Sequence, residues 1–240
     1  MSENFAIVKN KDKFVSYKPT GTAMKVINLG ETNTILNKFV AQMRDIDIQK
    51  DSMRFRRNLE RVGEIFAYEI SKTLEYSEKP VTTPLGIANI NTHDDKIVVA
   101  TILRAGLPLH QGILNFFDDA QNAFVAAYRK FNKSEGFNIN IEYSNTPDLE
   151  GKTLIIADAM LATGSSLEMT YAKLLEHGTP AHTHIVCPIS SAYAVEYLQK
   201  NIDGDKITLW VAGIDEELTS RSYIVPGLGD AGDLAYGNKK

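Results

Sequence analysis

Apolar side chains recur at intervals of three and four residues between residues 51 and 74. This spacing places them on one face of an α-helix, and Asp51 or Ser52 is a suitable N-terminal cap. We therefore expect a long amphipathic helix in this part of the chain. Its apolar positions are Phe55, Leu59, Val62, Phe66 and Ile70.

Short apolar runs alternate with helical patterns along the rest of the chain. Strands are predicted at 97–103, 123–128, 153–157, 184–188 and 207–211. Helices are expected after Pro108, over 166–177 with Gly178 as the stop, and over 191–199. Residues 139–143 alternate between apolar and polar, which indicates an exposed antiparallel strand. This order predicts an α/β fold: a twisted, mainly parallel sheet with helices on both faces.

Three charged residues directly follow predicted strands, and they are Arg104, Arg129 and Asp158. In open α/β sheets, ligands bind beyond the carboxyl ends of the strands. We therefore expect these three side chains on one rim of the sheet, facing a common site.

Composition narrows the class of protein. The 240 residues are 43% hydrophobic and 23% charged, as in an ordinary globular protein, and we expect a single domain over 1–240. A net charge of -4 disfavours a nonspecific nucleic-acid binder. The sequence has no recognisable signal segment and no apolar run of membrane-spanning length, so we expect a cytoplasmic protein without a membrane partner. The single cysteine, Cys187, excludes an intramolecular disulfide and a zinc cluster of thiolates.

The predicted strand at 153–157 leads into Asp158 and then into a run of small residues. That run is Ala162, Thr163, Gly164, Ser165 and Ser166. Its backbone amides and the positive end of the following helix can bind a phosphate, while Asp158 can accept hydrogen bonds from ribose hydroxyls. The segment therefore favours a ribose phosphate as ligand. The alternative is that Ser165 or Ser166 only caps the helix, since the segment lacks the lysine and spacing of a nucleotide P-loop.

Two arginines are candidates to contact the same polyanion. Arg104 lies in Leu-Arg-Ala-Gly-Leu-Pro, where Gly106 lets the backbone approach a ligand closely or adopt an uncommon conformation. Arg129 opens a polar stretch that runs to Gly151, and we expect this stretch to form a hairpin that carries the arginine over the site. The alternative for each is an arginine in a solvated turn or loop.

A glycine-rich run lies near the end of the chain. Residues 223–233 contain three glycines and two aspartates after the apolar residues Ile224, Val225 and Pro226. We expect neither an ordinary helix nor an ordinary strand here, but a segment that wraps a small flat ligand, with Tyr223 as an aromatic face. The alternative is a loose tail, against which the apolar residues argue.

These segments together resemble the uracil phosphoribosyltransferases in order and approximate spacing. The resemblance rests on Leu-Arg-Ala-Gly-Leu-Pro, Tyr-Arg, Asp-Ala-Met-Leu-Ala-Thr-Gly-Ser-Ser and Tyr-Ile-Val-Pro-Gly-Leu-Gly-Asp-Ala-Gly-Asp. It extends to Met43-Arg44-Asp45, Phe55-Arg56 and Ile214-Asp215-Glu216. The C-terminal motif is the specific one, because phosphoribosyltransferases for other bases share the phosphate loop but not this run.

The resemblance implies a type I phosphoribosyltransferase fold with a small hood and a β-hairpin arm. It implies a helical segment at about 30–76 and a base-binding segment at about 214–237. The implied activity transfers the 5-phosphoribosyl group from phosphoribosyl pyrophosphate (PRPP) to uracil, giving UMP and pyrophosphate in pyrimidine salvage, usually with Mg2+. A homodimer or higher homo-oligomer is implied as well, and a purine nucleotide effector is left open.

The resemblance also implies roles for individual residues. Arg104, Arg129 and magnesium would face the pyrophosphate, where negative charge accumulates as its bond to the ribose breaks. Asp158 would hold the ribose hydroxyls and residues 162–166 the 5′-phosphate, which positions the anomeric carbon. Asp230 would organise a magnesium-bound water or assist loss of the uracil proton, and no residue is assigned as a direct metal ligand.

The base would be bound by the C-terminal run, at Tyr223, Ile224, Gly229 and Ala231. A carbonyl of Ile224 and an amide of Gly229 would satisfy uracil, whereas cytosine would leave a buried group unpaired. We therefore predict that Gly229→Val fills the base pocket and abolishes uracil turnover.

Three positions depart from the family pattern. Ala159 stands where proline is expected, Ser165 where a second glycine is usual, and Leu234 in a stretch where an arginine is typical. The first two are small, so we expect phosphate binding to survive. We expect the absence of the arginine to affect regulation and contacts between subunits more than the transfer reaction.

Other interpretations of the chain remain open at this point. One is a transferase for another base, such as a purine or orotate. A second is a nucleotide-sensing regulator that keeps the fold and binds RNA or a protein without turnover. His182 and His184 alternate on a predicted strand, and we expect a structural role because further metal ligands are not evident.

Overall fold

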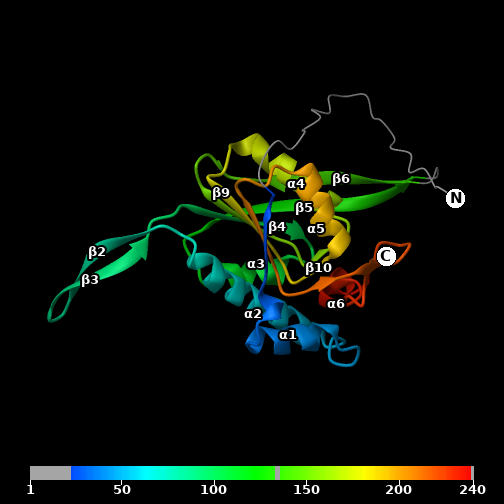
Figure 1. Cartoon of the computed structure of the whole chain (residues 1–240), viewed down its shortest axis with the longest axis horizontal. Helices are drawn as coiled ribbons and strands as arrows, with labels where there is room; N and C mark the ends of the chain where they lie inside the picture. The colour runs from blue at the N-terminus through cyan, green and yellow to red at the C-terminus, as the bar shows by residue number, and fades with distance from the viewer. Residues whose placement is uncertain (1–22, 133–135, 239–240) are drawn as a thin grey trace.

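The computed structural model describes residues 23–132 and 136–238, and the side chains of 127–142 lie outside the description. Its centre is a seven-stranded sheet in the order β1-β11-β9-β7-β4-β5-β6 (Figure 1). All neighbouring pairs are parallel except β5 and β6. The strands are β1 (Lys25–Asn28), β4 (Ile97–Leu103), β5 (Gln121–Asn132), β6 (Gly136–Asn145), β7 (Thr153–Ala157), β9 (His182–Cys187) and β11 (Ile207–Val211). The predicted mainly parallel α/β sheet is confirmed.

Helices cover both faces of this sheet (Figure 1). One face carries α1 (Ile35–Arg44), α2 (Ser52–Ser71), α3 (Leu107–Leu114) and α6 (Ala231–Tyr236). The opposite face carries α4 (Ser165–Leu174) and α5 (Ala192–Asn201). Two short 3-10 turns, η1 (Leu29–Glu31) and η2 (Leu175–His177), complete the helical elements of the described ranges. None of the helices in those ranges combines the length and the apolar character that a bilayer crossing requires.

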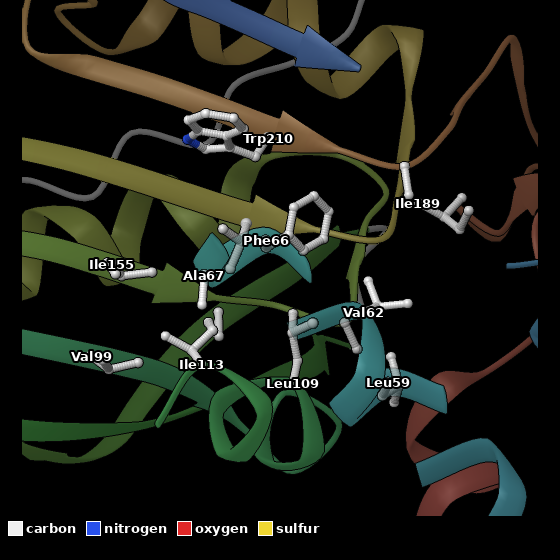
Figure 2. Packing of buried hydrophobic residues seen from close by; sticks show 14 of the residues in the cluster. Leu59, Val62, Phe66, Ala67, Val99, Leu109, Ile113, Ile155, Ile189 and Trp210 are labelled. Carbon is white, nitrogen blue, oxygen red and sulfur yellow. The ribbon is translucent and has the colours of Figure 1, made fainter. Parts of the chain in front are cut away.

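The central strands read as apolar runs because each face packs against a separate hydrophobic cluster. In β4, Val99 belongs to the cluster under α2 and α3, whereas its neighbour Val98 belongs to the cluster under α4 and α5. In β7, Ile155 and Leu154 divide in the same way. Figure 2 shows side chains of α2 and α3 meeting Val99 and Ile155 in the first cluster.

The predicted amphipathic helix is α2. All five of its predicted apolar positions are buried. Its N-cap is Asp51, whose side chain accepts a hydrogen bond from the Arg54 amide at 3.1 Å. The helix after Pro108 begins one residue earlier, at Leu107, and the proline lies in its first turn, where its missing amide hydrogen costs nothing.

Two features of the hairpins differ from the expectations. Strands β2 (Tyr76–Thr83) and β3 (Gly86–His93) form a hairpin that projects far from the sheet (Figure 1). The hydrophobic pattern predicted no element there, and the β-hairpin arm implied by the resemblance was not assigned to these residues. Both strands are largely exposed on both faces, so no apolar alternation marks them. Strand β5 also continues to Asn132, so the backbone of Arg129 lies within the β5-β6 ribbon and not just after a strand.

Short strands flank the carboxyl end of the main sheet. β8 (Met160–Leu161), β10 (Ile189–Ser191) and β12 (Ile214–Asp215) form a small parallel sheet. β13 (Glu217–Leu218) pairs antiparallel with β14 (Ile224–Val225). The prediction that residues 223–233 contain neither strand nor helix is therefore wrong in part. Two residues pair in β14, and the Asp230 carboxylate caps α6 by accepting from the Asp233 amide at 3.0 Å.

Candidate active site

Asp158 and the small-residue loop lie between β7 and α4. The Asp158 amide donates to the Val186 carbonyl at 3.1 Å, so the chain stays beside β9 for one residue beyond β7. Gly164 occupies the N-cap position of α4 with φ 82, a conformation that favours glycine. The hydroxyls of Thr163 and Ser165 lie 3.0 Å apart, and no side chain caps α4. The alternative in which Ser165 or Ser166 only caps the helix is therefore wrong, and the first-turn amides face the loop without a side-chain cap.

Residues of α5 hold this loop in place. The Ser191 hydroxyl donates to the Ala162 carbonyl at 2.6 Å and accepts from the Ala194 amide at 2.9 Å, so one side chain binds the loop and caps α5. A Cβ atom on Gly164 would lie 2.8 Å from Cδ1 of Tyr197, which leaves no room for a side chain there. From the sequence, Ser191 is expected only as the first residue of a helix. Its contact with Ala162 depends on the pairing of β8 with β10, which the local sequence does not show.

The Tyr197 hydroxyl donates to the Glu168 carboxylate at 2.6 Å. Burial, followed by the hydrogen bond to Glu168, raises the pKa of Tyr197. The tyrosine therefore remains a hydrogen-bond donor at neutral pH. Its acceptor, Glu168, lies in the first turn of α4, the helix that follows the phosphate loop. This contact fixes the position of Glu168 beside the helix N-terminus.

The loop after β4 packs against the end of β7. A Cβ atom on Gly106 would lie 2.8 Å from the Ala157 carbonyl oxygen, so glycine allows this close approach. The Arg104 side chain is exposed, with Nη2 3.8 Å from Asp233 Oδ1 and donating to the Gly237 carbonyl at 3.4 Å. Arg104 therefore reaches the C-terminal segment from the rim, and it is not an arginine in a purely solvated turn.

The C-terminal run is packed against the body of the protein at its apolar residues. Ile224 and Ala231 are buried in the cluster of α2, against which Ala105 and Ala162 also pack. Gly229 has φ 93, and within the described residues no atom other than those of its chain neighbours lies within 4 Å of the position of an added Cβ. The run is thus not a loose tail, and open space lies beside Gly229.

The structure brings most of the predicted site residues to one end of the sheet. Arg104, Asp158, the loop at 162–166 and the run at 224–231 converge there through the contacts described above. Tyr223 is 45% exposed at the edge of this group. The side chain of Arg129 lies outside the described residues, so its place on the rim stays a prediction.

The two neighbouring histidines have structural partners. His184 Nδ1 accepts from the Trp210 indole at 3.1 Å, and His182 Nε2 lies 3.0 Å from the Thr208 hydroxyl. Burial lowers the pKa of His184 to about 3, so this imidazole is neutral. Within the described residues, no group of three or more His, Cys, Asp or Glu side chains is arranged to hold a metal ion. The hydrogen bonds to Thr208 and Trp210 of β11 support the expected structural role of these histidines.

Comparison with known proteins identifies the family. The sequence model of the family described as "Uracil phosphoribosyltransferase" matches residues 31–238. The chain belongs to the uracil phosphoribosyltransferase family. A protein of Porphyromonas gingivalis named uracil phosphoribosyltransferase is 56% identical over 216 residues, covering 90% of this chain and 100% of that protein. One from Methanothermobacter thermautotrophicus is 40% identical, covering 78% of this chain and 85% of its own length.

A solved structure has the same fold. The AQ2163 protein from Aquifex aeolicus matches with a TM-score of 0.78 and 30% identity, over 88% of this chain and 98% of that one. The fold expected from the resemblance to uracil phosphoribosyltransferases is confirmed.

The structure accommodates the three departures from the uracil phosphoribosyltransferase pattern. Ala159 is buried in the apolar cluster of α2, where its small side chain fits. Ser165 lies in the first turn of α4, and the left-handed conformation falls on Gly164. Leu234 packs against the apolar cluster, so an apolar contact stands where the family typically has a charge.

Proposed function

We propose that this chain transfers the 5-phosphoribosyl group from PRPP to uracil and releases UMP and pyrophosphate. The observation that carries this proposal is the convergence of a phosphate loop and a glycine-rich run on one apolar cluster, in a member of this family. A phosphate loop alone fits many nucleotide-binding proteins. Its combination with an open space beside Gly229 favours a nucleobase next to a sugar phosphate.

Residues on α4 and β7 would position the sugar. The first-turn amides of α4, with the hydroxyls of Thr163, Ser165 and Ser166, would bind the 5′-phosphate. Asp158 would accept hydrogen bonds from the ribose hydroxyls. Holding the sugar at both ends places the anomeric carbon between the pyrophosphate oxygen, whose bond breaks, and uracil N1, whose bond forms.

The negative charge on the leaving pyrophosphate would be stabilised by cations near that group. The leaving pyrophosphate gains negative charge while the ribose becomes positive, so cations near the pyrophosphate lower the barrier. Arg104 would take this role, and the loop that carries it packs on Ala157. We propose the same role for Arg129, which the β5-β6 ribbon would bring to the site.

The C-terminal run would select the base. The Ile224 carbonyl and the Gly229 amide would pair with uracil, while Tyr223 and Ala231 would line the pocket. Cytosine would present a donor to the amide donor, at a cost of about 1 to 3 kcal/mol for each unsatisfied buried group. Asp230 caps α6 through one carboxylate oxygen, and we propose that it also organises a magnesium-bound water or assists loss of the uracil proton.

We propose that Mg2+ binds at this site together with PRPP. Mg2+ usually binds one or two carboxylates together with phosphates and water. The described residues hold no cluster of three or more candidate ligands. Asp158 and Asp230 would be the carboxylates beside the proposed position of the PRPP. When bound, magnesium supplies positive charge beside the departing pyrophosphate.

We also propose that the chain works as a cytoplasmic homo-oligomer. The support is the β2-β3 hairpin, which projects from the body and carries exposed apolar side chains, including Leu85 at 99% and Ile87 at 75% exposure. Exposed apolar side chains concentrated on one projection are typical of a protein interface.

The test is an assay of pyrophosphate release from PRPP with uracil, cytosine, guanine or orotate, each with and without magnesium. We expect release with uracil and magnesium only. A preference for guanine or orotate would contradict the base assignment. Binding of nucleotides without turnover of any base would favour the regulator instead.

A further inference from the structure

A charged pair connects the end of α1 to the start of the base-binding run. Arg44 binds Asp215 through two parallel hydrogen bonds, Nη1 to Oδ2 at 2.7 Å and Nη2 to Oδ1 at 2.9 Å. Arg44 Nη1 also donates to the Gly227 carbonyl at 2.9 Å, and Asp215 Oδ2 accepts from the Gly227 amide at 2.9 Å. Both backbone polar groups of Gly227 are thus held by this pair.

Gly227 lies between the two groups proposed to read the base. It has φ 55, and a Cβ atom on it would lie 2.2 Å from the Ile224 carbonyl oxygen, so the turn is tight. Gly229 follows two residues later. Any movement of the Gly227 peptide therefore changes the distance between the Ile224 carbonyl and the Gly229 amide.

The same pair is connected to the phosphate loop. Asp215 lies on β12 and is paired in register with Ser191 of β10. Ser191 in turn donates to the Ala162 carbonyl in the phosphate loop. A continuous path of hydrogen bonds and strand pairing therefore leads from Ala162 through Ser191 and Asp215 to Gly227.

We propose that Arg44 and Asp215 are positioning residues that hold the base-binding run at a set distance from the phosphate loop. The inference rests on the proposed function, since it assigns the run to uracil. Asp215 is 8% exposed and Arg44 24% exposed, so water competes little for the pair. A bidentate arginine–carboxylate pair has a defined planar geometry, which lysine cannot reproduce.

The experiment compares Asp215→Asn and Arg44→Lys with the wild type in steady-state kinetics. We expect the KM for uracil to rise about 10- to 100-fold, because a small displacement of a binding group has effects of this size. The KM for PRPP should change less than about twofold, since the loop at 162–166 keeps its own contacts. The matched control is Glu176→Gln, which removes the charge from an exposed ion pair with Lys173. Glu176 lies in η2, where the His177 carbonyl accepts from the Leu149 amide at 2.8 Å in the loop before β7, at the end of the sheet away from the site. The control variant should leave both KM values unchanged.

An unchanged KM for uracil in both variants, or an equal rise in both KM values, would overturn the inference. Amide hydrogen exchange of residues 224–229 gives a second measurement that does not depend on turnover. Faster exchange of this run in Asp215→Asn than in the wild type supports the inference, and equal rates overturn it. Absence of uracil-dependent pyrophosphate release in the wild type would contradict the proposed function separately.

Discussion

Gly229 combines a left-handed backbone, at φ 93, with open space on the side where a side chain would point. A valine at this position would occupy the space assigned to uracil and would add about 1 to 2 kcal/mol of backbone strain. We expect Gly229→Val to abolish uracil turnover, as measured by pyrophosphate release.

The control for this substitution is Gly151→Val. Gly151 also has positive φ, at 66, and apart from its chain neighbours no atom of the part of the chain that the structure describes lies within 4 Å of an added Cβ. It precedes β7, at the end of the sheet away from the site. Gly151→Val should carry a similar strain and keep uracil turnover, so loss of activity in both variants would refute the pocket assignment.

His184 gives a prediction on pH and stability. Its pKa lies near 3 in the folded protein because of burial, and at its ordinary value of 6.5 when unfolded. Between these values the unfolded chain binds the extra proton, so the free energy of unfolding falls as the pH falls, by up to about 1.4 kcal/mol per pH unit. Lowering the pH from 7 to 5 should therefore cost about 2 kcal/mol through this residue.

Urea unfolding at both pH values measures this effect. His184→Gln keeps an acceptor for Trp210 but does not titrate, so its stability should depend less on pH than that of the wild type. His177→Gln, at an exposed position, should retain the wild-type dependence. An equal pH dependence in wild type and His184→Gln would show that the imidazole does not cause it.

At the scale of elements, Ser191 joins α5 to the phosphate loop through one hydroxyl. Ser191→Ala should lower the free energy of unfolding by about 0.5 to 2 kcal/mol through loss of the cap. Because the Ala162 carbonyl also loses its partner, we expect a higher KM for PRPP. Thr34→Ala removes the cap of α1 and serves as the control, with a similar loss of stability and an unchanged KM for PRPP. An equal effect of both variants on this KM would contradict the anchoring role.

Elements that bury a face could be predicted from the sequence, and elements without one could not. The apolar positions of α2 and the runs of β4 and β7 follow directly from the two clusters they pack against. The hairpin of β2 and β3 is exposed on both faces, so its sequence shows no alternation of apolar and polar residues.

The candidate site divides in a similar way. The phosphate loop is one continuous segment, and its chemistry could be predicted from local residues. The contact between Arg44 and Asp215 spans 171 positions, so its geometry depends on how β12 and α1 pack, which no local pattern reports. Ser191 could be assigned as a cap, but not as the partner of Ala162, for the same reason.

At the scale of the whole molecule, the β2-β3 hairpin projects from the body of the chain (Figure 1). Leu85→Ser combined with Ile87→Thr removes two of its exposed apolar side chains without touching the described core. We expect this double variant to have a lower mass than the wild type in light scattering coupled to size exclusion. An unchanged mass, with the wild type oligomeric, would exclude these side chains from the interface.

The most direct test of the central claim is a crystal structure of the protein with UMP. The account predicts the phosphate of UMP at the amides of residues 162–166, with the ribose hydroxyls on Asp158. It predicts the pyrimidine between the Ile224 carbonyl and the Gly229 amide. A pyrimidine bound away from residues 224–229, or a phosphate bound away from α4, would contradict the account.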